Sequence, residues 1–111
     1  MTPRIYVYLL AGTLFAALGQ VLFKVGATGR NALFDFVNAW IIAGLVSYAL
    51  GTMLWIYSLS KAQLTIVYPF TALTFVLVYL VGVFVLGEAT SLKAMVGVAA
   101  VLLGLFLIST A

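Results

Sequence analysis

The sequence predicts an all-α integral membrane protein, a bundle of four transmembrane helices that we expect to be dimeric. Hydrophobic residues make up 67% of the 111-residue chain and charged residues only 6%, whereas roughly a quarter of the residues in soluble domains are charged. Four long apolar runs alternate with short connections, and each run is long enough to cross a bilayer. The length allows one domain, so residues 1–111 are expected to form a single transmembrane domain.

The first apolar run, from Ile5 to Phe23, contains no charged residue and is followed by Lys24. At about 1.5 Å per residue, a helix of this length reaches roughly 28 Å. A secretory signal peptide has a shorter apolar region of about 7–15 residues, followed by a small-residue cleavage site. The run is longer than that and ends at a lysine, so we predict a membrane-spanning helix over about residues 5–24.

The second and third runs are joined by a short polar turn. Trp40 and Tyr57 lie near the ends of the second run, where aromatic side chains act as interfacial anchors. Pro69 lies in the first turns of the third run, where its missing N–H costs little but a bend is expected. These patterns predict helices over about residues 39–59 and 64–86.

The fourth run follows Thr90 and Ser91, and either hydroxyl can cap a helix beginning there. We predict this helix over about residues 92–109. Glu88 precedes it, and a carboxylate near a helix N-terminus is favourable and can pair with the nearby Lys93. Asp35 and Glu88 are the two carboxylates of the chain, and both fall between the apolar runs. The membrane-spanning segments are therefore expected to contain no acid.

The loops predict an antiparallel arrangement that encloses little volume, so two chains build a solute pathway more easily than one. Orientation in the membrane follows the distribution of Lys and Arg. Here the two sides are nearly balanced, with Arg4 and Lys61 against Lys24, Arg30 and Lys93. A single orientation and a dual topology that gives an antiparallel dimer are both compatible with this balance.

The residue inventory argues against an enzyme. The chain has no Cys and no His, which excludes disulfides and the usual zinc and haem ligands. It also contains no nucleophile–base pair and no glycine-rich phosphate loop. The net charge of +3 is small and scattered. We therefore expect no catalytic residue, no cofactor, no metal and no nucleic-acid partner.

Three polar or aromatic side chains within the runs are candidates for a binding site. Gln20 is the one strongly polar side chain deep in the first half of the chain, and its amide needs a partner in hydrocarbon. That partner is either a neighbouring helix or a substrate. Tyr48 and Trp55 are seven residues apart on one helix face, which either packs against lipid and core or lines a cavity.

Further candidates lie near the helix ends. Tyr68, Pro69 and Thr71 open the third run, where a bend would expose backbone and a hydroxyl group to a cavity. Basic side chains at helix ends normally extend to the membrane interface. Three of them can instead hold an anionic lipid head group: Lys24, Arg30 and Lys61.

Small residues recur at helical spacing in three of the runs. Gly97, Ala100 and Gly104 share one face of the fourth run, and such faces let membrane helices approach closely. Spacing alone leaves open whether this face packs within the chain or against a second chain. Similar stripes occur in the first two runs: Gly12, Ala16 and Gly19, and Gly44, Ser47 and Gly51.

The order of several motifs resembles the drug/metabolite transporter superfamily over the whole chain. The motifs are Gly19-Gln20-Val21-Leu22-Phe23-Lys24, Val67-Tyr68-Pro69, Gly87-Glu88, and Gly97 with Gly104. The small multidrug resistance branch is similar in chain length, in the lysine that closes helix one (Lys24), in the tyrosine that opens helix three (Tyr68) and in the paired glycines of helix four. The resemblance to that branch implies a dimer contact through the face formed by Gly97, Ala100 and Gly104.

That branch also carries a glutamate midway along its first helix, which binds protons and cations, and here Ala16 stands at that position. The tryptophan that the branch carries after its helix-three tyrosine falls on Thr71. The four-helix EamA-like group is similar in the same Gly-Gln, Lys, Tyr-Pro and Gly-Glu motifs, and it lacks the glutamate too. This group includes the paired flippase subunits for undecaprenyl-phosphate aminoarabinose, and the sequence favours it.

The resemblance to the EamA-like group implies a multi-pass protein of the bacterial inner membrane. Its activity would be the translocation of a polyprenyl-phosphate-linked sugar, or a similar amphipathic lipid, by alternating access in a homodimer or in a heterodimer with a paralogous four-helix subunit. The alternatives are a small-multidrug-type exporter of cations or metabolites and a non-transporting assembly partner. The expected substrate-binding residues are Gln20, Lys24, Tyr48, Trp55, Tyr68 and Thr71, with Pro69 and Glu88 as motif residues.

Overall fold

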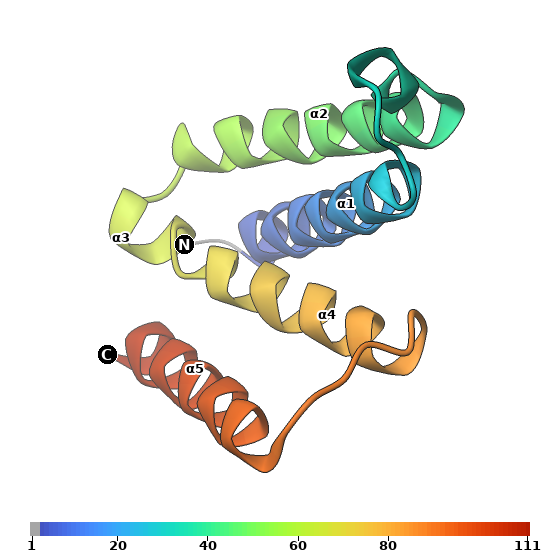
Figure 1. The fold of residues 1–111 in the computed structure, drawn as a ribbon. Coiled ribbons are helices and arrows are strands. Elements are labelled where there is room, and N and C mark those ends of the chain that lie inside the picture. Colours follow the sequence, from blue (N-terminus) through green and yellow to red (C-terminus); the bar gives the residue numbers. More distant parts are fainter. Residues whose placement is uncertain (1–2) are drawn as a thin grey trace.

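The computed structural model describes residues 3–111, and it confirms an all-helical fold with four helices long and apolar enough to cross a membrane. Figure 1 shows the helices side by side in the order α2, α1, α4, α5. The described chain measures 46 × 35 × 18 Å, so the helices form a thin layer. The elements are α1 (Pro3–Ala27), the 3-10 turn η1 (Leu33–Phe36), α2 (Ala39–Leu59), α3 (Leu64–Val67), α4 (Phe70–Phe84) and α5 (Leu92–Thr110).

The tightest packing joins α1 to α2 through their small residues. A Cβ added to Gly19 would lie 2.9 Å from the carbonyl oxygen of Gly44, and one added to Gly51 would lie 2.8 Å from that of Gly12. The Ser47 hydroxyl donates to the Phe15 carbonyl across the same interface, at 2.8 Å. The stripes in the first two runs therefore face each other, and the absence of side chains lets the two backbones meet.

The third span is interrupted at Pro69, which separates α3 from α4. Because proline has no N–H, it cannot bond to the carbonyl four residues earlier. The N–H groups of Thr71 and Ala72 bond three residues back instead, to the carbonyls of Tyr68 and Pro69, both at 2.9 Å. The third span thus has a break in its α-helical hydrogen bonding where a bend was expected, at the level where the span faces α1 and α2.

The connection between α4 and α5 turns at Gly87, whose φ of 71° lies in the left-handed region that favours glycine. The Glu88 N–H then bonds back to the carbonyl of Gly82 at 2.9 Å. Ser91 caps α5, because its hydroxyl accepts a hydrogen bond from the N–H of Ala94 at 3.1 Å. One of the two expected capping hydroxyls is therefore the cap, whereas Thr90 bonds to the Tyr79 hydroxyl.

The fourth helix stands apart from the others. α5 packs mainly against α4, and none of the α5 residues that the structure describes is buried. A groove of about 500 Å³ separates its C-terminal half from the start of α1 and from the Pro69 break, with Tyr6, Leu10 and Phe70 among its walls. The chain is therefore more open than the compact arrangement that its short loops suggest.

A small apolar core closes one end of the helix layer. Leu9 and Val67 have no exposed surface and pack with Ile5. Trp55 and Phe70 pack against this cluster from α2 and α4. The cluster fixes the start of α1 against the turn that enters the third span.

Candidate functional site

A cavity of about 380 Å³ lies between α1, α2 and the broken third span. Its volume falls in the range of about 300–1,000 Å³ that is usual for small-ligand pockets. The apolar core of Ile5, Leu9 and Val67 lies beside it and shares Trp55 with it. The lining residues are Gly12, Thr13, Ala16, Gln20, Tyr48, Gly51, Thr52, Trp55, Tyr68, Thr71 and Thr74.

The cavity is polar without being charged, since no Asp, Glu, Lys or Arg lines it. Three threonine hydroxyls donate to carbonyls of their own helices: Thr13 to Leu9 at 2.8 Å, Thr52 to Tyr48 at 2.9 Å and Thr74 to Phe70 at 3.4 Å. Each such hydroxyl keeps lone pairs that can accept a further hydrogen bond. Gln20, Tyr48, Trp55 and Tyr68 add donors, so the cavity suits a hydroxyl-bearing group.

The structure brings together five of the six residues expected to bind substrate. Gln20, Tyr48, Trp55, Tyr68 and Thr71 all line the cavity, together with Ala16. Lys24 does not line it but follows Gln20 by one helical turn on the same face.

Sequence reasoning did not single out Thr52 and Thr74 as lining residues. Their signal was present in the spacing, because Thr52 is four residues from Tyr48 and Thr74 is three from Thr71. Residues at these spacings share a helix face.

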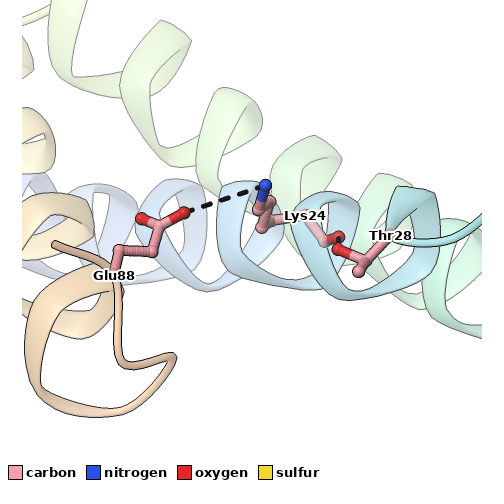
Figure 2. Close-up of polar contacts among 3 residues, drawn as sticks. All are labelled: Lys24, Thr28 and Glu88. Atoms are coloured by element: carbon pink, nitrogen blue, oxygen red, sulfur yellow. Dashed lines mark hydrogen bonds and ion pairs between the residues drawn. The ribbon is translucent and has the colours of Figure 1, made fainter.

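Lys24 pairs with Glu88 across the end of α1 and the α4–α5 connection (Figure 2). The Lys24 Nζ atom lies 3.7 Å from Oε2 of Glu88, and both side chains are at least half exposed. The expected pairing of Glu88 with Lys93 is therefore wrong. Lys93 is near in sequence, but the turn at Gly87 directs the carboxylate back over α4 toward α1.

The three basic candidates for a lipid phosphate do not form one cluster. The Nε atom of Arg30 donates to the Gly26 carbonyl at 3.2 Å, near the C-terminal end of α1. Lys61 lies beyond the opposite end of α2, with its Nζ 5.9 Å from the centre of the Tyr57 ring. A 21-residue helix separates the two levels, about 30 Å at 1.5 Å per residue. Lys61 therefore cannot share one head group with Lys24 and Arg30.

The small face of α5 contacts nothing else in the described chain. A Cβ added to Gly97 or to Gly104 would have no heavy atom within 4 Å, apart from its own helix. Ala100, between them, is exposed. Unlike the stripes of α1 and α2, this one has no partner within residues 3–111, and its role as a dimer interface stays a prediction.

No metal site is evident in residues 3–111, where no three His, Cys, Asp or Glu side chains gather. The groups that the cavity offers to a ligand are hydroxyl, amide and aromatic groups.

The sequence model of the EamA-like transporter family matches residues 4–110. The chain belongs to the EamA-like transporter family.

Individual relatives are similar over nearly the whole length of the EamA-like chain. A protein of Yersinia pestis (strain Pestoides F) is 32% identical over 108 residues, 94% of this chain and 95% of its own. One from Pseudomonas savastanoi pv. phaseolicola is 31% identical over 106 residues, 91% of this chain and 93% of its own. Both are named as probable 4-amino-4-deoxy-L-arabinose-phosphoundecaprenol flippase subunits, ArnE.

Family membership confirms the predicted superfamily and makes this EamA-like protein a multi-pass membrane transporter. The relatives are named as flippase subunits rather than as enzymes, in agreement with the expectation drawn from the residue inventory.

Proposed function

We propose that this EamA-like protein is a subunit of a flippase for a polyprenyl-phosphate-linked amino sugar, of the kind named in its relatives. The observation that carries the proposal is the acid-free cavity of about 380 Å³ lined by Gln20, Tyr48, Trp55, Tyr68 and Thr71. Hydroxyl, amide and indole groups match the hydroxyls of a sugar. A small-multidrug-type exporter instead needs a carboxylate, and Ala16 lines the cavity where that carboxylate would stand.

In this mechanism the sugar enters the cavity and the polyprenyl tail stays in the bilayer. The aromatic rings of Tyr48, Trp55 and Tyr68 attract an ammonium group on the sugar through their π faces. Lys24, one turn beyond Gln20, is placed to contact the phosphate, because Lys is a common point-charge partner of phosphate. The aromatic rings and the nearby Lys24 would thus each contact one of the two opposite charges of the head group.

The exposed face of α5 supports a second protomer. The four helices form a layer 18 Å thick, and a second subunit packed against it would help to enclose the cavity. We propose a homodimer, or a heterodimer with a paralogous four-helix subunit, in the bacterial inner membrane. Transport follows from rocking of one protomer against the other, which exposes the cavity alternately on the two sides.

The test is translocation in proteoliposomes that contain the protein with a paired four-helix subunit and a polyprenyl-phosphate-linked amino sugar. Gln20→Leu keeps the side-chain size but removes the amide, so we expect about five- to tenfold slower translocation, as for one lost hydrogen bond. Gln63→Leu is the matched control, because Gln63 is exposed and lies outside the cavity. The proposal fails if no such lipid is moved faster than in protein-free vesicles.

A further inference from the structure

We infer that Glu88 is a built-in counter-ion for Lys24, and that the phosphate of a lipid substrate replaces the Glu88 carboxylate when it binds. This inference rests on the proposed function and assigns a competing group to its phosphate site. The pair joins two segments that are distant in sequence, the last turns of α1 and the α4–α5 connection. Figure 2 shows the carboxylate pointing at the ammonium group along the side of α1.

The pair is weak enough to be exchanged. The distance of 3.7 Å between Nζ and Oε2 is an ion-pair distance but exceeds that of a hydrogen bond. The side chains are 58% and 50% exposed, so water screens their attraction. The phosphodiester of such a lipid has two unesterified oxygens and one negative charge, as the carboxylate has, so it can take the place of Glu88 beside the Lys24 ammonium group.

Lys24 lies where the phosphate of a bound sugar lipid would be. Gln20 lines the cavity and Lys24 follows it at i+4, a spacing that brings Cβ atoms within about 5–6 Å on one face. In a sugar linked to a polyprenyl phosphate, the phosphate is bonded directly to the sugar. A head group with its sugar at Gln20 thus brings its phosphate within reach of the flexible Lys24 side chain.

The place of the Glu88 carboxylate depends on Gly82. A Cβ added to Gly82 would lie 2.6 Å from Oε1 of Glu88, so the carboxyl group lies against the bare backbone of α4. The Glu88 N–H also bonds to the Gly82 carbonyl, at 2.9 Å. An alanine at position 82 would push the flexible end of the Glu88 side chain away while keeping both charges. Gly82→Ala therefore weakens the pair in a way that differs from neutralising Glu88.

Exchange of the counter-ion has a structural consequence. When phosphate takes the place of Glu88, the ion pair that ties the α4–α5 connection to α1 is broken. Since α5 packs mainly against α4, its position then depends on α4 and on whatever subunit covers its small face. Substrate binding thereby frees the α4–α5 connection from Lys24, while α4 itself stays packed against α1.

The experiment measures binding of farnesyl phosphate by calorimetry to the protein in phosphatidylcholine nanodiscs. We expect Glu88→Gln and Gly82→Ala to bind it about 1.5- to fivefold tighter than the wild type, the range set by exposed ion pairs. Lys24→Gln should bind it several-fold more weakly. Farnesol, which lacks the phosphate, should bind equally to all four proteins. Inorganic phosphate in place of the lipid tests whether the phosphate group alone gives the same ratios.

Two results would overturn the inference. If Glu88→Gln weakens binding as Lys24→Gln does, Glu88 orients Lys24 rather than competing for it. If Glu88→Gln and the wild type bind farnesyl phosphate equally, the pair is unrelated to phosphate. The proposed function fails separately, when these affinity ratios hold but no lipid-linked sugar is translocated. If inorganic phosphate gives the same affinity ratios between variants and wild type, the phosphate group alone is sufficient to replace Glu88.

Discussion

Ala16 is the residue on which the type of substrate depends most directly. It lines the cavity between Thr13 and Gln20 on α1, facing residues contributed by α2 and the third span. A methyl group at this position makes no electrostatic contact, so the cavity cannot hold a lone cation through a carboxylate. The same site with one acid would be an organic-cation site, since intramembrane acids are the usual partners of such ligands.

Replacing Ala16 with Glu tests this argument. We expect Ala16→Glu to bind tetraphenylphosphonium at least about tenfold more tightly than Ala16→Gln, because opposite charges about 6 Å apart attract by roughly 3 kcal/mol at an effective dielectric constant of about 20. Affinity should increase as the pH rises, since only the ionised carboxylate attracts the cation. Equilibrium binding of the radiolabelled cation between pH 5 and 9 measures both effects. Equal affinities for the two variants at every pH would place residue 16 outside the ligand site.

Residue-scale prediction from the sequence succeeded where a residue and its neighbours share one helix. Tyr48 and Trp55 were placed together by helical periodicity, which depends only on local geometry. The Lys24–Glu88 pair was missed because its partners are far apart in the chain and meet only through the turn at Gly87. Helical periodicity contains no information about such a contact, so the nearer Lys93 was the natural and incorrect choice.

At the scale of elements, the α1–α2 hairpin is the rigid part of the molecule. Its backbones meet at Gly12 and Gly51 and again at Gly19 and Gly44. At Gly12, Gly19 and Gly51 the nearest atom opposite is a backbone carbonyl oxygen, so an added methyl group has nowhere to move, whereas at Gly44 it would first meet the Phe23 ring. The cavity wall formed by α1 and α2 is therefore held at a fixed spacing.

Gly51→Ala should destabilise this hairpin. The added Cβ would lie 2.8 Å from the Gly12 carbonyl oxygen and 3.1 Å from the Ala16 nitrogen, and overpacking of this kind costs about 1–3 kcal/mol. Gly97→Ala is the matched control, because its added Cβ meets no atom within 4 Å. Unfolding of the two variants in dilute detergent gives the comparison. A Gly51→Ala protein as stable as Gly97→Ala would show that the helices are not this close.

The sequence predicted the stripes and the irregularity at Pro69, but not which stripe meets which. Small residues specify that a close approach occurs, and they do not specify the partner. Helix ends differed for another reason. α1 continues past Lys24 to Ala27, and the Thr28 N–H and hydroxyl both bond to the Lys24 carbonyl, at 3.1 and 2.6 Å. Hydropathy marks where the membrane ends, whereas hydrogen bonds determine where the helix ends.

At the scale of the whole molecule, the isolation of α5 is the main departure from the expected arrangement. Spacing alone left open whether the small face of α5 packs within the chain or against a second chain. In residues 3–111 a Cβ added to Gly97 or Gly104 would meet no atom outside its own helix within 4 Å, and Ala100 is exposed. The surface of α5 is apolar enough to face lipid, so hydropathy alone could not distinguish a packed helix from an exposed one.

A bulky side chain on this face should disrupt association between subunits. We expect Gly104→Ile to raise the dissociation constant of the dimer by about tenfold or more, since overpacking at a close helix contact costs about 1–3 kcal/mol. Ala99→Ile is the control, because Ala99 is exposed and lies on another side of α5. Energy transfer between labelled subunits in liposomes measures the constant. If both variants associate as the wild type does, the partner binds elsewhere.

The separation of the α1–α2 hairpin from α5 also affects how the protein is made. Chains enter the membrane from the N-terminus during synthesis, so α1 and α2 leave the ribosome before α4 and α5. The hairpin can close its glycine contacts at once, without waiting for later helices. α5 emerges afterwards into a membrane where residues 3–111 offer its small face no contact beyond its own helix. Assembly with the proposed second subunit would thereby follow the folding of the rest of the protomer.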